Sequence, residues 1–302
     1  MIIAIDIGAT NISIARFSMD GTVEALMEFE SEQSLSASEF LTNLTEKIKI
    51  LAEPLKNLRG IGVGSCGVIR DGRILYSPNT SWKELNLKEE LSKTFKVPVS
   101  VINDADAFAI GVFYYEFKGR YESLCAITLG SGLGGALVSR NGVFSSYAGI
   151  SPELGHITVR KNGRLCSCGK RGCLEAYASE RSILQNYKRL RGGGNPSNAK
   201  ELLALWKNGD QTAGKAFQAF GEFLGIGLAS IHAIFSPDAF ILGGGISKAY
   251  SAFLGSCKET LYRNLIRGFP DKPKVLVSKF LRKASLLGAF HLLKRETLHK
   301  LW

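Results

Sequence analysis

A strand, a glycine turn and a second strand occur twice in this chain of 302 residues. The first copy begins with Ala-Ile-Asp-Ile-Gly-Ala-Thr at residues 4–10, and the second with Ala-Ile-Thr-Leu-Gly-Ser-Gly at 126–132. In each copy an apolar strand follows and ends at a polar turn with glycine, at 19–21 and at 140–142. Two copies are too few for a solenoid, whose repeats stack in series. The duplication therefore predicts two similar α/β domains that face one another.

The rest of the chain has the pattern of α/β domains as well. Apolar and β-branched runs predict strands at 2–7, 12–17, 22–29, 61–64, 99–102, 239–242 and 275–277. Apolar residues at helical spacing predict helices at 39–56 (capped by Ser38), at 87–95, through much of 199–234 and at 284–298.

The composition narrows the class of protein. Hydrophobic residues make up 45% of the chain and charged residues 22%, as in soluble globular proteins. We find no run of eighteen apolar residues, so no membrane partner is expected. Lysine and arginine exceed acidic residues by 38 to 27, but they are spread along the chain, and motifs of nucleic-acid-binding domains are missing. The charge of +11 by itself fits nucleic acid, an anionic small-molecule substrate or no specific partner, and the missing motifs argue against nucleic acid.

Four zinc-type ligands lie within eighteen positions: His156, Cys166, Cys168 and Cys173. A Cys3His set is typical of a closed, tetrahedral structural zinc site. The alternative is a disulfide framework, but such frameworks spread their cysteines through short secreted chains. No signal peptide opens this sequence, so we expect a cytoplasmic protein. The three remaining cysteines are single residues in apolar segments and are interpreted as packing residues: Cys66, Cys125 and Cys257.

Three glycine-rich turns each follow a buried strand. Glycine lets the backbone approach a ligand closely, so that N–H groups can hold phosphate oxygens. The residues expected to hold a nucleotide in this way are Gly8, Thr10, Gly130, Ser131, Gly132, Gly134, Gly243, Gly244 and Gly245. None of the turns has the Walker A pattern, and a strand rather than a helix follows Gly134. Asp6, at the end of the first strand, can hold Mg²⁺ or serve as a turn residue.

Other polar residues suggest the chemistry of the site. Asn103 and Asp104 end a buried strand and open a helix, so they are a substrate ligand and a proton acceptor, or simply a helix cap. Glu153, His156 and Glu175 flank the cysteine cluster and can hydrogen-bond sugar hydroxyls. His156 can do so with one ring nitrogen while the other binds zinc.

Taken together these motifs resemble the ROK family of sugar kinases. The matching segments run in order through almost the whole chain: Asp6–Thr10, Asn103–Ala105, Leu129–Gly135, Pro152–His156, Cys166–Glu175 and Leu242–Gly245. The Cys-x-Cys-Gly-x-x-Gly-Cys-x-Glu segment is the most specific of them.

The resemblance implies an actin/hexokinase-like fold of two RNase H-like domains around a central cleft. We expect a small domain of residues 1–110 with 288–302, and a large domain of 111–287 that carries the zinc site. The implied activity is transfer of the γ-phosphoryl of ATP to the 6-hydroxyl of a hexose, first of all glucose. Asp104 would be the general base, and Asn103, Glu153, His156 and Glu175 would bind the sugar. ATP, Mg²⁺ and structural Zn²⁺ are the implied cofactors, and a homodimer is the implied assembly.

Three departures from the family pattern bear on specificity. Asn11 stands where lysine is common, so a contact to phosphate is lost or replaced. Ser65-Cys66-Gly67 stands where a Pro-Gly turn is usual, and Ser151-Pro152 where Ala-Gly is common.

The motifs leave several functions open. N-acetylmannosamine, N-acetylglucosamine, allose and fructose kinases of the family share them. The family also contains sugar-sensing transcription regulators with an additional N-terminal winged-helix domain. The first strand begins at residue 2, and Asp104 is present, so we expect a kinase rather than a regulator or an inactive binding module.

Overall fold

The computed structural model describes residues 1–8, 10–31, 34–77, 82–191, 196–269 and 271–299. Contacts divide the chain into two compact units, each described here by itself. Unit 1 is Met1–Arg120, Ala136–Pro152 and Phe280–Trp302, and unit 2 is Tyr121–Gly135 and Glu153–Lys279. Of the predicted large domain, residues 111–120, 136–152 and 280–287 lie in unit 1. The predicted small domain (1–110 with 288–302) and large domain (111–287) stay a prediction.

The first sheet has the strand order β3-β2-β1-β4-β8. Its strands are β1 (Ile2–Ile7), β2 (Asn11–Phe17), β3 (Val23–Glu30), β4 (Ile61–Ser65) and β8 (Val99–Asn103). β1, β2 and β3 are antiparallel neighbours, whereas β1, β4 and β8 run parallel. A smaller sheet has the order β5-β6-β7, from β5 (Val68–Arg70), β6 (Arg73–Tyr76) and β7 (Lys83–Leu85), and the sequence pattern did not predict it.

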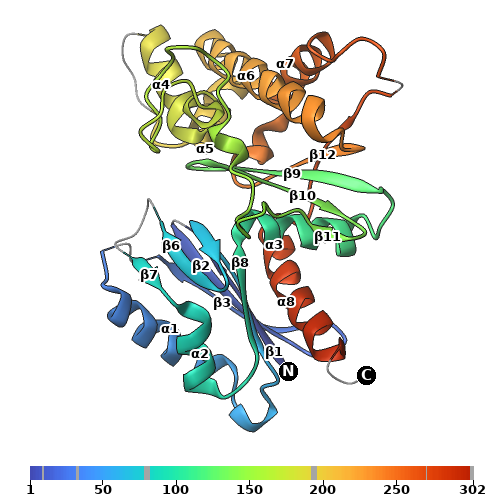
Figure 1. The fold of residues 1–302 in the computed structure, drawn as a ribbon. Helices are drawn as coiled ribbons and strands as arrows, with labels where there is room; N and C mark the ends of the chain where they lie inside the picture. The colour runs from blue at the N-terminus through green and yellow to red at the C-terminus, as the bar shows by residue number, and fades with distance from the viewer. Residues whose placement is uncertain (9, 32–33, 78–81, 192–195, 270, 300–302) are drawn as a thin grey trace. The chain divides into compact units, whose positions relative to one another are not determined.

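Both faces of the first sheet are covered, because its apolar residues alternate. Ile3, Ile5 and Ile7 join a core with helices α1 (Ala37–Leu51) and α2 (Leu87–Phe95). Ile2 and Ala4 point to the other face, against the C-terminal helix α8 (Arg282–His299). Helix α3 (Asp104–Gly111), which continues as a π-helix at Val112–Glu116, packs against α8 (Figure 1).

Helix α1 begins earlier than expected. Ser36, rather than Ser38, is the N-cap, and it forms a capping box with Glu39. The helix also ends at Leu51 instead of residue 56. The sequence has serines at alternate positions, 34, 36 and 38, and only the backbone conformation decided which of them caps the helix.

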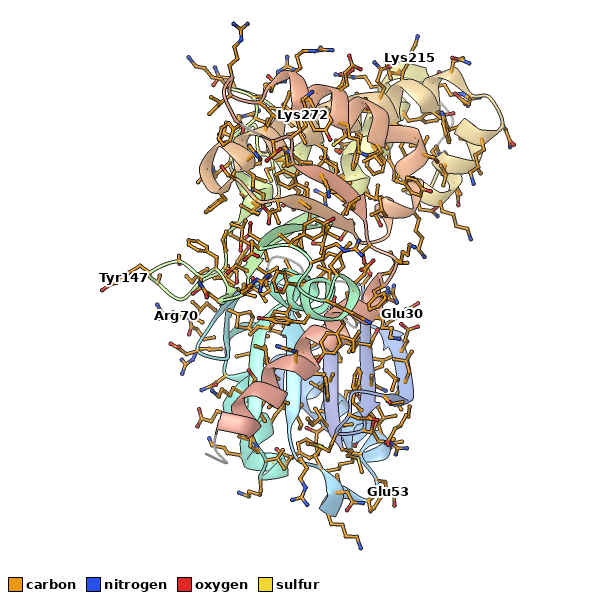
Figure 2. The ribbon with its side chains drawn as sticks, turned by 90° about the vertical axis from the view of Figure 1, so that its right-hand side faces the viewer. Glu30, Glu53, Arg70, Tyr147, Lys215 and Lys272 are labelled. Carbon is orange, nitrogen blue, oxygen red and sulfur yellow. The ribbon has the colours of Figure 1, made fainter. Side chains whose placement is uncertain are left out.

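The second sheet repeats the plan of the first, with the order β11-β10-β9-β12-β13. Its strands are β9 (Ser123–Leu129), β10 (Leu133–Ser139), β11 (Gly142–Val143), β12 (Ala239–Gly243) and β13 (Lys274–Val277). β9, β12 and β13 are parallel, and β10 and β11 form a hairpin. The duplication seen in the sequence is therefore a duplication of sheets. Beyond β11, the fully exposed Tyr147 projects from a surface loop (Figure 2).

Helices and short turns complete unit 2. The helices are α4 (Glu180–Arg191), α5 (Ala199–Lys207), α6 (Gln211–Phe235) and α7 (Tyr250–Arg263). Short helical turns lie at Leu154–His156, Leu174–Ala176 and Ile246–Ala249. Unit 1 has a similar turn at Leu55–Asn57. Among the described residues, α6 is the one helix long and apolar enough to cross a membrane. It packs against α4, α5 and α7, and 56% of its most apolar window is buried, which is typical of a core helix.

Candidate active site

In unit 1 the carboxyl ends of three parallel strands meet. β1 ends at Ile7, β4 at Ser65 and β8 at Asn103, and Ser65 pairs with both Ile7 and Asn103 in the register. The Cys66 amide donates to the Ile7 carbonyl at 2.9 Å, which joins the turn after β4 to β1. Ligands of α/β proteins bind at such strand ends. Asp6, Asn103 and Asp104, which the sequence proposed as site residues, all lie at this edge.

Asn103 and Asp104 form the junction between β8 and α3. The Asn103 Oδ1 accepts from the Ala105 amide at 2.9 Å, so Asn103 is the N-cap of α3. Its Nδ2 donates to the Gly67 carbonyl at 3.0 Å and fixes the turn after β4. Asp104 is the first residue of α3, where the helix dipole favours a negative charge. Asn103 therefore caps α3, and its role as a substrate ligand stays a prediction. Asp104 follows it at the end of the strand.

Asp6 has an unusual carboxyl group. Burial and the nearby negative charge of Asp104 raise its pKa to about 7, and the positive charge of Arg282 partly opposes this. The shift shows that the carboxyl groups of Asp6 and Asp104 are close enough to interact. Strongly shifted carboxyl groups gather at functional sites, because chemistry there uses groups held away from their usual protonation.

The first predicted phosphate turn lies between β1 and β2. The Gly8 amide donates to the Asn11 carbonyl at 3.0 Å, which closes the turn. Thr10 is exposed, and its Oγ1 accepts from the Asn11 Nδ2 at 3.1 Å. Ala9 lies outside the described residues. The turn follows Asp6 by two residues, so a phosphate bound there would lie near that carboxylate.

The other two glycine turns meet in unit 2. β9 and β12 are parallel, so their carboxyl ends bring Gly130–Gly134 and Gly243–Gly245 to one edge. Gly244 has a φ of +83°, and a Cβ atom there would lie 2.3 Å from the Leu129 carbonyl oxygen. Only glycine fits this position. Ser131 is exposed beside these backbone groups. The arrangement offers closely spaced backbone amides to an anionic ligand.

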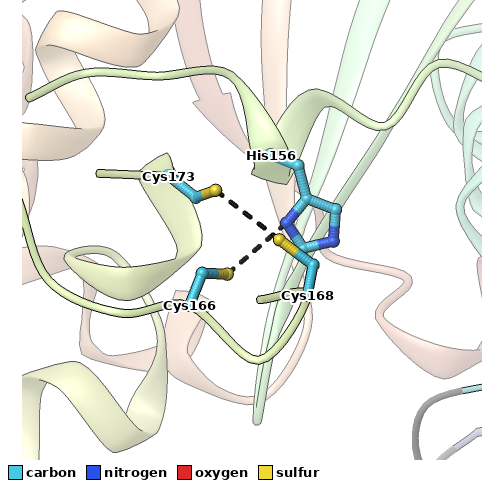
Figure 3. A group of neighbouring side chains, drawn as sticks. All are labelled: His156, Cys166, Cys168 and Cys173. Carbon is cyan, nitrogen blue, oxygen red and sulfur yellow. Dashed lines mark hydrogen bonds between the residues drawn. The ribbon is translucent and has the colours of Figure 1, made fainter. Parts of the chain in front are cut away.

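His156, Cys166, Cys168 and Cys173 come together as the sequence predicted (Figure 3). Their ligand atoms all lie within 4.8 Å of one another. The Cys168 and Cys173 sulfurs are 3.7 Å apart, and the Cys166 sulfur is 3.6 Å from His156 Nδ1. Two thiolates on one tetrahedral zinc ion would be about 3.8 Å apart, given Zn–S bonds of about 2.3 Å. The four residues therefore fit a tetrahedral metal ion, and all six cysteines are free of disulfides.

The residues proposed to bind sugar in unit 2 surround this cluster. His156 Nδ1 faces the cysteines, and its Nε2 lies 4.0 Å from Glu153 Oε2. Burial raises the pKa of Glu153, His156 opposes the increase, and Glu175 adds to it. Glu175 Oε2 accepts from the Leu133 amide at 3.1 Å, at the start of β10. Glu175 therefore joins the metal-type loop to the glycine turn that precedes β10.

Ser167 is a site residue that sequence reasoning missed. Its hydroxyl donates to Glu175 Oε1 at 2.7 Å, and the Cys166 thiol donates to the same oxygen at 3.4 Å. These contacts fix the Glu175 carboxylate, whose other oxygen is held by the Leu133 amide. The place of Ser167 between two ligand cysteines was the available signal, but serine in a loop is too common to single out.

Known proteins match this chain over almost its whole length. The model of the ROK family matches residues 2–296. A glucokinase of Thermotoga maritima is 30% identical over 98% of both chains. A xylose repressor of Bacillus subtilis is 28% identical over 95% of this chain and 75% of its own length.

Solved structures give the same result for the fold. A ROK family glucokinase from Streptomyces griseus, in complex with glucose and AMPPNP, matches with a TM-score of 0.85 and 29% identity, over 97% of this chain and 99% of its own. A ROK hexokinase from Thermus thermophilus matches with a TM-score of 0.83 and 26% identity, over 99% of both chains. The predicted actin/hexokinase-like fold is confirmed.

Proposed function

The chain belongs to the ROK family and is an ATP-dependent sugar kinase, and we propose that it phosphorylates the 6-hydroxyl of a hexose, first of all glucose. The observation that carries the proposal is the position of Asp104. It lies where three parallel strands end, at the start of a helix and next to Asn103. A glucokinase with this fold binds glucose and AMPPNP.

In the proposed reaction Asp104 accepts the proton of the attacking hydroxyl. The N-terminus of α3 favours a negative charge at this position, and a carboxylate there can accept a proton. Asn103, Glu153, His156 and Glu175 orient the sugar through hydrogen bonds. The phosphates of ATP bind to the three turns at Gly8 and Thr10, Gly130–Gly134 and Gly243–Gly245. Phosphoryl transfer depends mostly on such positioning and on stabilisation of charge.

Two metal ions complete the proposal. Asp6 is the residue proposed to hold Mg²⁺, which would offset the negative charge of the phosphates. Zinc, when bound to His156 and the three cysteines, fixes the loop that carries Glu153 and Glu175. The thiol ligands and free cysteines fit a reducing compartment, so we place the protein in the cytoplasm. A homodimer stays a prediction.

A sugar-responsive regulator is the second candidate, because a xylose repressor is similar over 95% of this chain. A coupled assay of ADP release over hexoses, N-acetylhexosamines and xylose separates the two. We expect sugar-dependent turnover, fastest with glucose. Turnover with none of the sugars, together with tight binding of one, would support the regulator and refute the kinase. Fastest turnover with allose, fructose or an N-acetylhexosamine would instead correct the substrate.

The catalytic assignment is tested by Asp104→Asn, which keeps the shape of the side chain but cannot act as a base. We expect ADP release to fall by about 10²–10⁴-fold, with the circular dichroism spectrum and the zinc content unchanged. The matched control is Asp271→Asn, which removes one exposed carboxylate elsewhere and is expected to retain activity. Near-normal turnover by Asp104→Asn would show that another group takes the proton.

A further inference from the structure

An arginine at the start of α8 lies at the edge of the first sheet. Arg282 Nη1 donates to Glu28 Oε1 at 3.2 Å, and the Ser13 hydroxyl donates to the same oxygen at 3.1 Å. In the register, Glu28 pairs with Ser13, and Ser13 pairs with Asp6. Cross-strand partners point to the same face of a sheet. Asp6, Ser13 and Glu28 therefore form one row, on the face that α8 covers.

The row leads from Arg282 to Asp6. Neighbouring strands are about 4.8 Å apart, so the row from β3 to β1 spans about 10 Å. Arg282 Nη1 already reaches inward to the oxygen that it shares with Ser13, on the middle strand. Its charge also acts on Asp6, where it opposes the rise in pKa. The guanidinium thus lies within electrostatic reach of the strand end where phosphate is expected.

Several acidic side chains gather near the end of β1, so a positive charge there would be favourable. Asp6 and Asp104 are both acidic, and Glu30, at the end of β3 (Figure 2), pairs with Asn11 in the register. Asn11 itself is neutral, and its Nδ2 donates to Thr10. A phosphate bound at the end of β1 would add negative charge beside these carboxylates.

We propose that Arg282 binds a phosphate oxygen of ATP and supplies the positive charge that Asn11 lacks. The inference rests on the proposed function, because it takes ATP as the ligand of this edge. A guanidinium has five N–H donors in a planar fork that suits phosphate, and Glu28 engages it through Nη1. Glu28 and Ser13 then hold the arginine in place from the β-sheet side.

The simpler alternative is an ion pair that only fastens α8 to β3. The Arg282 and Glu28 side chains are 55% and 49% exposed, and exposed ion pairs contribute little to stability. On that alternative, replacing Arg282 would leave nucleotide binding unchanged. On ours, nucleotide binding would weaken, and the binding of sugar would not.

The test measures AMPPNP and glucose binding by calorimetry, together with kcat and KM, for Arg282→Gln. We expect AMPPNP affinity and kcat/KM for ATP to fall about 10–100-fold, with glucose affinity within about twofold of wild type. Lys283→Gln removes the same charge one residue further along the helix and is the matched control. This control should bind AMPPNP within about threefold of wild type.

A charge-relocation variant makes the test specific. Asn11→Lys in the Arg282→Gln background should restore most of the lost AMPPNP affinity, because it returns a cation to the same edge. Unchanged AMPPNP affinity in Arg282→Gln would overturn the proposal, and so would an equal loss in Lys283→Gln. A wild-type protein that binds AMPPNP through Arg282 but phosphorylates no sugar would refute the proposed kinase function and support this inference.

Discussion

Asp6 shows how a single residue can be unfavourable for stability and suited to a site. Its carboxylate is partly buried beside Asp104, and its pKa rises to about 7. Folding therefore strengthens proton binding at Asp6. The free energy of unfolding falls as the pH rises from about 4 to about 7, because the ionised form is disfavoured only in the folded state. A bound cation would reverse this cost, which fits a residue placed for a metal–phosphate ligand.

Asp6→Asn should accordingly stabilise the protein when ATP and magnesium are absent. We expect a gain of about 2–4 kcal/mol in the free energy of unfolding at pH 8 and almost none at pH 4. Urea denaturation at several pH values measures it. Asp20→Asn is the contrasting variant, because the Ser18 hydroxyl and the Thr22 amide lower the pKa of Asp20. Asp20→Asn should not stabilise the protein at pH 8. A gain in the free energy of unfolding of Asp6→Asn that does not depend on pH would contradict the explanation for Asp6.

At the scale of elements, the segment from Leu154 to Ala176 contains only two short helical turns and two isolated bridges. Little regular backbone pairing holds this loop. The Cys166 amide donates to the Lys170 carbonyl at 2.8 Å, and the Gly169 amide donates to the Cys166 carbonyl at 3.0 Å. These turns present the thiols to one another. A metal ion bound by the four ligands would add to the order of this loop.

Cys168→Ser should lose the zinc ion, because serine is a poor replacement for a thiolate ligand. With the loop loosened, we expect glucose to bind at least about tenfold more weakly, as when groups that support metal ligands are removed. AMPPNP affinity should change much less. Zinc per chain and the two dissociation constants are the measurements. Cys257→Ser, in the buried part of α7, should keep its zinc. Unchanged glucose affinity in the zinc-free protein would show that the metal does not support sugar binding.

At the scale of the whole molecule, the end of the chain completes the first unit. Helix α8 packs on β1, β4 and α3, so residues 280–302 belong with the N-terminal part. The approach between α8 and α3 is very close. A Cβ atom at Gly288 would lie 1.8 Å from the Ala107 carbonyl oxygen, on the helix that begins with Asp104. Any side chain at residue 288 would push the two helices apart.

Gly288→Ala should therefore lower the free energy of unfolding by about 1–3 kcal/mol, the usual cost of overpacking. Displacement of α3 should also reduce kcat, because Asp104 would move. Thermal unfolding and the ADP assay measure the two effects. Gly255→Ala, in α7, is the matched control: a Cβ atom there meets nothing within 4 Å, and alanine favours the helix. Equal effects of the two substitutions would exclude close packing as the cause.

Local patterns predicted much of the molecule. Alternating and continuous apolar runs gave the strands of both five-stranded sheets apart from the two-residue β11, because burial of one or both faces imposes those patterns on the residues themselves. The spacing of four ligand residues gave the metal-type cluster. The strands of the small sheet were missed, since three- and four-residue strands carry too little periodicity. Arg282 was missed because its contact joins segments far apart in the sequence. Ser167 was missed because serine is too common in loops to be singled out.

The sequence by itself determined the duplication, the three glycine turns, the Asn103–Asp104 pair and the Cys3His set, because each is a short-range pattern of residue types. Only the tertiary structure decided that Asn103 caps α3, that Glu175 fastens the glycine turn, and that the charge of Arg282 acts on Asp6. Those relations depend on strand register and helix packing. Both arise from burial summed over a whole unit, which no local stretch of the chain contains.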